Sequence, residues 1–160
     1  MLHPRENGDP VEQDKILERL NREVARELIT MMRYLLQSLM VFGFQRGAAV
    51  SFLREQVEES MQHAIRLGEK LVALGGTPSI KFSEVYEPKP VPLEELLHEA
   101  LEAEQEGLDD LMEFHSWLDA DNDIPLKHLI EGIISEEAKQ VDEIQKYLKQ
   151  VDGKEGLMLE

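Results

Sequence analysis

The sequence predicts an all-α protein, a four-helix bundle with one long crossover between its second and third helices. Apolar residues recur at intervals of three and four over four long stretches, and no stretch shows the alternation typical of a strand. The connections between these stretches are short, long and short. A long second connection makes the second and third helices parallel, which is a one-crossover bundle topology rather than simple up-down-up-down.

The first two helices are expected at about 11–42 and 48–74, separated by the glycine-containing break "GFQRG" at 43–47. The glycine pair at 75–76, with a proline behind it, is a standard helix end. The expected apolar stripe of the first helix is Ile16, Leu20, Val24, Leu28, Met31, Leu35 and Leu39.

The segment 75–92 contains four prolines and two glycines and shows no helical period. Fully extended, it spans roughly 55–60 Å, whereas a helix of ~27 residues is about 40 Å long, so it can run the length of the bundle. The third and fourth helices are expected at about 92–119 and 125–151. The predicted organisation is therefore a flexible N-terminal segment (1–10), the bundle (11–151) and a C-terminal tail (152–160).

The composition restricts the function. The 160 residues carry 33 acidic and 17 basic side chains, a formal net charge of −16. Such a surface repels nucleic acid and anionic lipid and attracts cations, so neither nucleic acid nor membrane is an expected partner. No cysteine is present, which excludes thiolate metal sites and is compatible with the reducing cytoplasm, the expected location. No apolar run approaches the ~18 residues of a membrane span.

Three glutamates fall on the apolar stripes of three different helices. Glu27, Glu104 and Glu137 each lie four or seven residues from apolar members of the stripe on the first, third and fourth helix. Gln140 shares the face of Glu137, one turn further on. A buried carboxylate is costly unless it is paired or bound to a metal. Any one of these glutamates alone could instead extend to the surface, and Gln140 alone could be a locally bonded amide.

The second helix contributes a histidine to the same depth. At ~100° per residue, Ser60 lies at the centre of its stripe, His63 about 60° from it and Glu59 about 100° from it. His63 alone could be a hydrogen-bonded core residue. Acids on three helices together with an imidazole on the fourth are what a di-iron carboxylate site requires, and this donor set suits iron, manganese or zinc.

Four segments resemble the bacterioferritin branch of the ferritin-like superfamily, in the same order along the chain. They are "ELITMMRY" (27–34), "HAIRLGEKLVALGGTPSI" (63–80), "ALEAEQEGLDDL" (100–111) and "IISEEAKQVDEI" (133–144). The resemblance implies a dinuclear iron site with a first position at Glu27, Glu59 and His63 and a second at Glu104, Glu137 and Gln140. It also matches Met61 to a methionine that binds haem between two subunits, although a methionine at this place more often packs at an interface.

The sequence departs from the family at two of these positions. The family's second helix usually carries Glu-x-x-His, but position 60 holds serine. Either a π-bulge carries Glu59 into the ligand position, or Ser60 faces the site and one bridging carboxylate is missing. On the fourth helix, Gln140 stands where bacterioferritins have a second histidine.

Two functions follow from this pattern. The first is a bacterioferritin-like protein that oxidises Fe(II) at a site inside the bundle for iron storage or detoxification, with ferroxidase activity left open. The second is a degenerate ferritin-like protein with an incomplete metal site and a structural or partner-binding role. In either case, a homo-oligomer is expected, because these residues exceed what one inner stripe uses: Ile29, Met32, Leu36, Met40 and Ile65.

Overall fold

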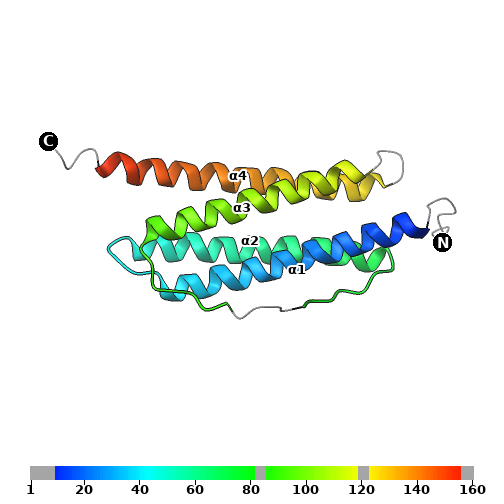
Figure 1. The fold of residues 1–160 in the computed structure, drawn as a ribbon, viewed down its shortest axis with the longest axis horizontal. Coiled ribbons are helices and arrows are strands. Elements are labelled where there is room, and N and C mark those ends of the chain that lie inside the picture. The colour runs from blue at the N-terminus through cyan, green and yellow to red at the C-terminus, as the bar shows by residue number, and fades with distance from the viewer. Residues whose placement is uncertain (1–9, 82–85, 119–122, 156–160) are drawn as a thin grey trace.

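The computed structural model describes residues 10–81, 86–118 and 123–155, which form four helices. These are α1 (Pro10–Met40), α2 (Arg46–Ala73), α3 (Leu93–Trp117) and α4 (Ile124–Glu155). Figure 1 shows α1 and α2 as one antiparallel hairpin and α3 and α4 as a second hairpin packed against it. Within the described ranges no named strand occurs, and the all-α four-helix class is confirmed.

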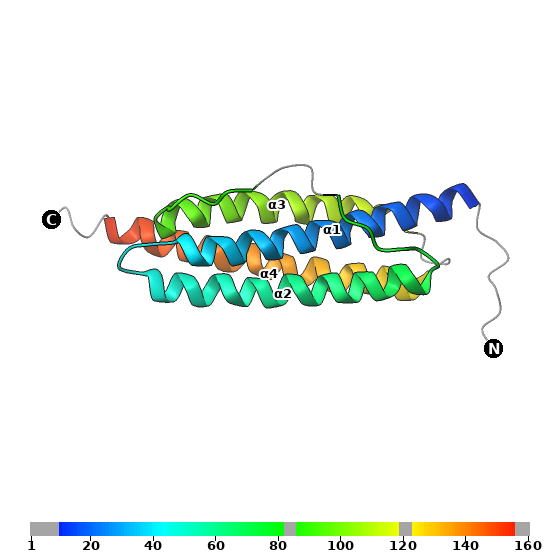
Figure 2. The same ribbon diagram turned by 90° about the horizontal axis from the view of Figure 1, so that it is seen from below.

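The crossover between α2 and α3 contacts the bundle near both of its ends. α2 ends and α3 begins at opposite ends of the bundle, so these two helices are parallel, as predicted (Figure 2). Near the start of the crossover, Asn21 Nδ2 donates to the Ser79 carbonyl at 3.0 Å, and the Ser79 N–H donates to Asn21 Oδ1 at 2.8 Å. Near its end, Phe42 and Pro92 form an isolated backbone bridge.

The helix ends follow the expected chemistry. Gly75 has a positive φ of 91° and donates to the Val72 carbonyl at 3.0 Å, which is a glycine end of the predicted kind. At the start of α4, Asp123 Oδ1 accepts from the Leu126 N–H at 2.9 Å. Residues 152–155, expected in the tail, continue α4. The rest of the predicted tail (156–160) and residues 1–9 of the predicted N-terminal segment lie outside the described residues.

The core consists of two apolar clusters, one toward each end of the bundle. The first contains Leu20, Val24, Leu67, Leu71, Leu111, Phe114, Leu118, Leu126, Ile130 and Ile133. The second contains Tyr34, Val41, Ala49, Phe52, Leu53, Leu96, Leu97, Ala100, Ile144 and Leu148. Along every helix, a stretch lies between the two clusters, and each stretch includes one of the predicted site positions: Glu27, His63, Glu104 and Glu137. The clusters therefore place these four residues at one depth.

The outer surface of α1 is more apolar than the sequence predicts. Leu35 and Leu39 were expected on the inner stripe but are 43% and 56% exposed, whereas Gln37 and Ser38 are buried. A side chain four residues on lies slightly past one full turn, so a stripe built mostly of four-residue steps drifts around the helix. By Leu39 this drift from Leu20 is roughly 100°, and the side chain no longer faces the core. Despite this apolar surface, no helix in the described part of the chain has an apolar stretch long enough to cross a membrane.

We expect Leu111→Ala to reduce the free energy of unfolding by about 2–5 kcal/mol, because it opens a cavity at a side chain with no exposed area. Urea denaturation of the metal-free protein measures this. The matched control is Met112→Ala, since Met112 is the next residue and is 55% exposed. It should change the stability by no more than about 0.5 kcal/mol. Equal losses in the two variants would contradict the assignment of the core.

Candidate metal centre

Three buried side chains from three helices meet in the layer between the apolar clusters. Glu27 of α1, His63 of α2 and Glu137 of α4 each have at most 2% of their surface exposed. His63 Nδ1 lies 3.3 Å from Glu27 Oε1 and 3.9 Å from Glu137 Oε1. One donor atom from each residue lies within 4.8 Å of the others, close enough to hold one metal ion. Carboxylate oxygen and imidazole nitrogen suit iron, manganese or zinc.

The other nitrogen of His63 faces outward. Its Nε2 lies 2.8 Å from Glu136 Oε2, and Arg66 also hydrogen-bonds to Glu136. Glu59, His63 and Glu136 form a second group whose donor atoms lie within 4.8 Å of one another. The imidazole thus separates a buried set of carboxylates from a partly exposed one. A cavity of about 540 Å³ opens here, lined by Glu55, Glu58, Glu59, Gln62, His63, Arg66 and Glu136.

The position of Glu59 answers the question raised by the serine at position 60. α2 is an uninterrupted α-helix from Arg46 to Ala73, so no π-bulge turns Glu59 inward. Ser60 is buried at 4% exposure on the inner face, and Glu59 is only partly buried. The structure therefore brings Glu59 together with His63 and Glu136, not with Glu27 and Glu137.

The two remaining predicted ligands are buried but are not part of either group. Glu104 of α3 accepts a hydrogen bond from the Tyr34 hydroxyl of α1. Gln140 of α4 is also buried. Met61, the candidate haem ligand, is partly buried on α2, and its role stays a prediction.

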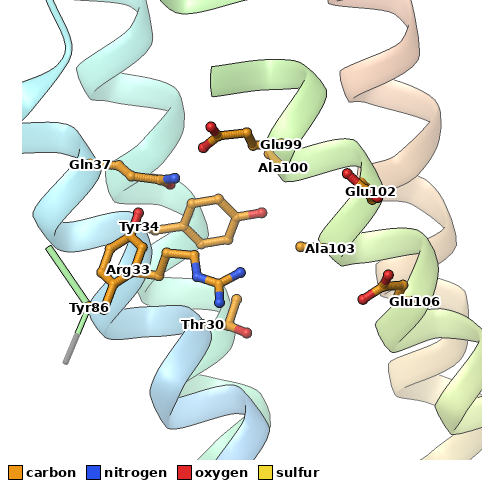
Figure 3. Close-up of a pocket in the computed structure, with 10 residues that line it drawn as sticks. All are labelled: Thr30, Arg33, Tyr34, Gln37, Tyr86, Glu99, Ala100, Glu102, Ala103 and Glu106. Atoms are coloured by element: carbon orange, nitrogen blue, oxygen red, sulfur yellow. The ribbon is translucent and has the colours of Figure 1, made fainter. Parts of the chain in front are cut away.

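A further cavity of about 270 Å³ lies on the outer side of Tyr34, between α1 and α3. Figure 3 shows the Tyr34 ring extending from α1 toward α3, with Arg33 and Tyr86 on the near side. The Arg33 guanidinium carbon lies 5.4 Å from the centre of the Tyr86 ring, a cation–π distance. Tyr34 therefore lines this cavity and also donates a hydrogen bond to Glu104.

The sequence analysis missed Glu136, described above beside His63, and two buried residues of the layer, Arg26 and Glu23. Arg26 Nη2 donates to Glu137 Oε1 at 2.7 Å and to Glu27 Oε1 at 3.2 Å, and Arg26 Nε donates to Glu23 Oε2 at 3.0 Å. Glu23 is 1% exposed and also accepts from Arg19 Nε at 3.0 Å. The available signal was Glu23 itself, which lies one turn before Glu27 and three residues before Arg26.

Burial and neighbouring charges often have opposite effects on the pKa values of the side chains in this layer. Burial raises the pKa of Glu137 to about 8, against the attraction of Arg26 and with the repulsion of Glu27. For Glu27, burial is outweighed by the His63 hydrogen bond and the charge of Arg26, which lower its pKa. For His63, burial is outweighed by Glu27 and Glu136, which raise its pKa. Burial raises the pKa of Glu104, although the Tyr34 hydrogen bond opposes this. In the absence of a metal, Glu137 therefore holds a proton more readily than Glu27.

The residues present fit one metal ion. Glu137 Oε2 is buried and, among the residues that the structure describes, has no hydrogen-bond partner, so it can serve as a ligand without losing one. Together with Glu27 and His63 it provides three protein ligands. A second ion is not provided for in the same way, because the remaining buried carboxylate of α3, Glu104, lies outside this group and is engaged by Tyr34.

A one-crossover bundle with buried carboxylates and a histidine on facing helices is the architecture of the carboxylate class of metal-binding bundles. The described part of this chain has that architecture. The chain belongs to the Ferritin family: residues 17–153 match its ferritin-like domain. The predicted membership of the ferritin-like superfamily is thereby confirmed. A comparison with curated proteins found no match.

Solved structures support the same fold. The chain is similar to a ferritin-like di-iron carboxylate protein of Bacillus anthracis (TM-score 0.77, 25% identity, covering 86% of this chain and 97% of that one). It is also similar to the dodecameric thioferritin, a bacterioferritin-related protein, of Bacteroides fragilis (TM-score 0.84, 18% identity, covering 92% of this chain and 92% of that one). A third similar structure is the bacterioferritin of Rhodobacter capsulatus (TM-score 0.77, 23% identity, covering 92% of this chain and 89% of that one).

We expect the metal-free protein to lose stability as the pH rises from about 4.5 to about 8. Folding raises the pKa of Glu137 over this window, so the folded state binds the extra proton, and its stabilisation is complete below the ordinary pKa and lost by about pH 8. His63, whose pKa is also raised, contributes with the same sign. The slope should be on the order of 1 kcal/mol per pH unit.

Thermal unfolding in the presence of a chelator, at a series of pH values, measures this dependence. Glu137→Gln should reduce the slope of the profile, because it removes one titrating group and leaves the contribution of His63. Glu113→Gln is the control, since Glu113 is exposed, and it should keep the native profile. A native profile that rises between pH 5 and 8 would show that Glu137 is ionised in the folded protein.

Proposed function

We propose that this protein binds Fe(II) at Glu27, His63 and Glu137 inside the bundle, where dissolved dioxygen or peroxide accepts its electrons and Fe(III) is formed for iron storage or detoxification, in a homo-oligomeric assembly. The single observation that carries the proposal is the convergence of these three buried side chains, from three helices, within 4.8 Å. Bound iron supplies the redox chemistry. The side chains hold the ion and exclude bulk water from it.

The charge distribution supports iron as the substrate. The net charge of −16 concentrates cations near the surface. The acidic cavity around Glu59 and Glu136 lies directly outside His63, so a cation drawn there is separated from Glu27 and Glu137 by one imidazole. Loading the inner site requires Glu137 to release its proton, and binding should therefore strengthen as the pH rises.

The proposal is tested by anaerobic Fe(II) titration with metal analysis, followed by exposure to air and measurement of Fe(III) absorbance. The native protein should bind at least one ion per chain and oxidise Fe(II) faster than buffer does. His63→Ala should weaken binding by more than ~10-fold, because it removes one of three ligands. The control is His128→Ala, since the His128 side chain is 74% exposed and contacts only Glu131 among the ion pairs described.

Binding of less than one ion per chain, with oxidation at the rate of buffer alone, would instead favour the second function, a degenerate ferritin-like protein. Two observations favour that alternative. Ser60 occupies the inner face where the family pattern has a carboxylate, and Arg26 already forms ion pairs with Glu27 and Glu137.

A homo-oligomer is supported by the outer surface of the α1–α2 hairpin. Six large apolar side chains are exposed there. Ile29, Met40 and Ile65 were expected from the sequence, whereas Leu35, Leu39 and Phe42 were not. The other two expected residues, Met32 and Leu36, are partly buried. Exposed large apolar side chains gathered on one hairpin are typical of a subunit interface. The dodecameric assembly of the Bacteroides fragilis relative supports a closed shell as its form.

We expect Leu39→Glu to shift the assembly toward smaller species, because it places a charge in the proposed interface. Sedimentation velocity measures the mass of the assembly. Met112→Glu, an equally exposed position on α3, should leave the mass unchanged. A native protein that sediments as a monomer would remove the oligomer from the proposal and leave the iron site untouched.

A further inference from the structure

Arg26 lies within the layer of proposed metal ligands. Its guanidinium contacts three carboxylates, those of Glu23, Glu27 and Glu137, from two helices. Two of these carboxylates are the oxygen ligands of the proposed iron site. At such distances the positive guanidinium takes the place that a metal ion could have as the partner of buried carboxylates.

α3 leaves room for this guanidinium. Gly107 lies one turn beyond Glu104 and is buried, and a Cβ added to it would collide with Arg26 Nη1. Glycine inside a helix is destabilising relative to alanine. At position 107 the missing side chain leaves room for the guanidinium of Arg26 in its present place, and an alanine there would require the guanidinium to shift. By contrast, a Cβ added to Gly68 in α2 would meet no atom within 4 Å.

The charges of the layer indicate how many ions it can accept. Four buried carboxylates, those of Glu23, Glu27, Glu104 and Glu137, carry four negative charges when ionised. Arg19 and Arg26 contribute two positive charges in direct contact with them. One divalent cation cancels the remaining two negative charges. A second divalent cation would leave two uncompensated positive charges in a buried layer, which is costly.

We propose that Arg26 occupies the second cation position of the centre, so that each chain takes one divalent ion where a di-iron bundle takes two. The proposal rests on the proposed function, because it presupposes that Glu27, His63 and Glu137 hold a metal. It assigns Arg26 a charge-compensating role and Gly107 the role of providing its space. The hydrogen bond from Tyr34 to Glu104 acts in the same direction, since it engages the carboxylate that α3 would contribute to a second ion.

The test counts ions in three variants of the full chain. Arg26→Gln removes the charge, Gly107→Ala removes the space, and Gly68→Ala is the matched glycine control. Mn(II) alone is the probe, because it is stable in air near neutral pH and its electron paramagnetic resonance signal distinguishes an isolated ion from a coupled pair. Equilibrium dialysis gives the number of ions per chain. We expect one isolated ion in the native protein and in Gly68→Ala, and two coupled ions in Arg26→Gln or Gly107→Ala.

Each outcome decides the question. A second ion in either variant, with one in the native protein, supports the proposal. Two ions in the native protein, or one ion in all the variants, would overturn it while leaving the proposed function intact. No ion in the native protein would remove the proposed function itself, and the inference with it.

The thermal stability of the metal-free protein tests the role of Arg26 without counting bound ions. Without Arg26 the carboxylates lack their partner, so Arg26→Gln should melt at a lower temperature than the native protein in chelator. Saturating Mn(II) should raise its melting temperature by more than that of the native protein. An Arg26→Gln variant that melts like the native protein in chelator would contradict the compensating role of Arg26.

Discussion

Compensation of buried negative charge is the constraint on which this structure depends. Four carboxylates lie on the inner faces of three helices, at a depth where ionised groups cost several kcal/mol unless they are paired. The chain meets this cost with its own donors: guanidinium groups on α1, the Tyr34 hydroxyl and the imidazole of His63. A metal ion therefore competes with partners that are already in place, and the charge balance limits how many ions can enter.

The apolar clusters on both sides of the layer make this balance possible. Each cluster takes side chains from all four helices, which fixes the register of the helices relative to one another. A slip of one residue in any helix would rotate its polar group by ~100° away from the centre. The anchoring of the crossover at Ser79 and Pro92 accompanies the parallel arrangement of α2 and α3, which brings residues 63 and 104 to the same depth.

The sequence predicted what depends on period and register. The helices, the crossover and the common depth of Glu27, Glu104 and Glu137 follow from spacing alone. It did not predict the partner of each carboxylate. An arginine next to a ligand position can extend to solvent or fold inward. The contacts that favour the inward orientation come from other helices as well as its own, namely the ion pair with Glu137 and the open space at Gly107. The orientation of Glu59 likewise depended on whether α2 continued without a bulge, which spacing leaves open.

Ser60 and Arg26 act in the same direction on the charge of the layer. The serine brings no carboxylate to a position where the family pattern has glutamate, and the arginine places a positive charge in contact with Glu27 and Glu137. A layer with one carboxylate fewer would bind a second ion more weakly. With the buried guanidinium as well, the charge balance proposed above is complete with a single divalent ion.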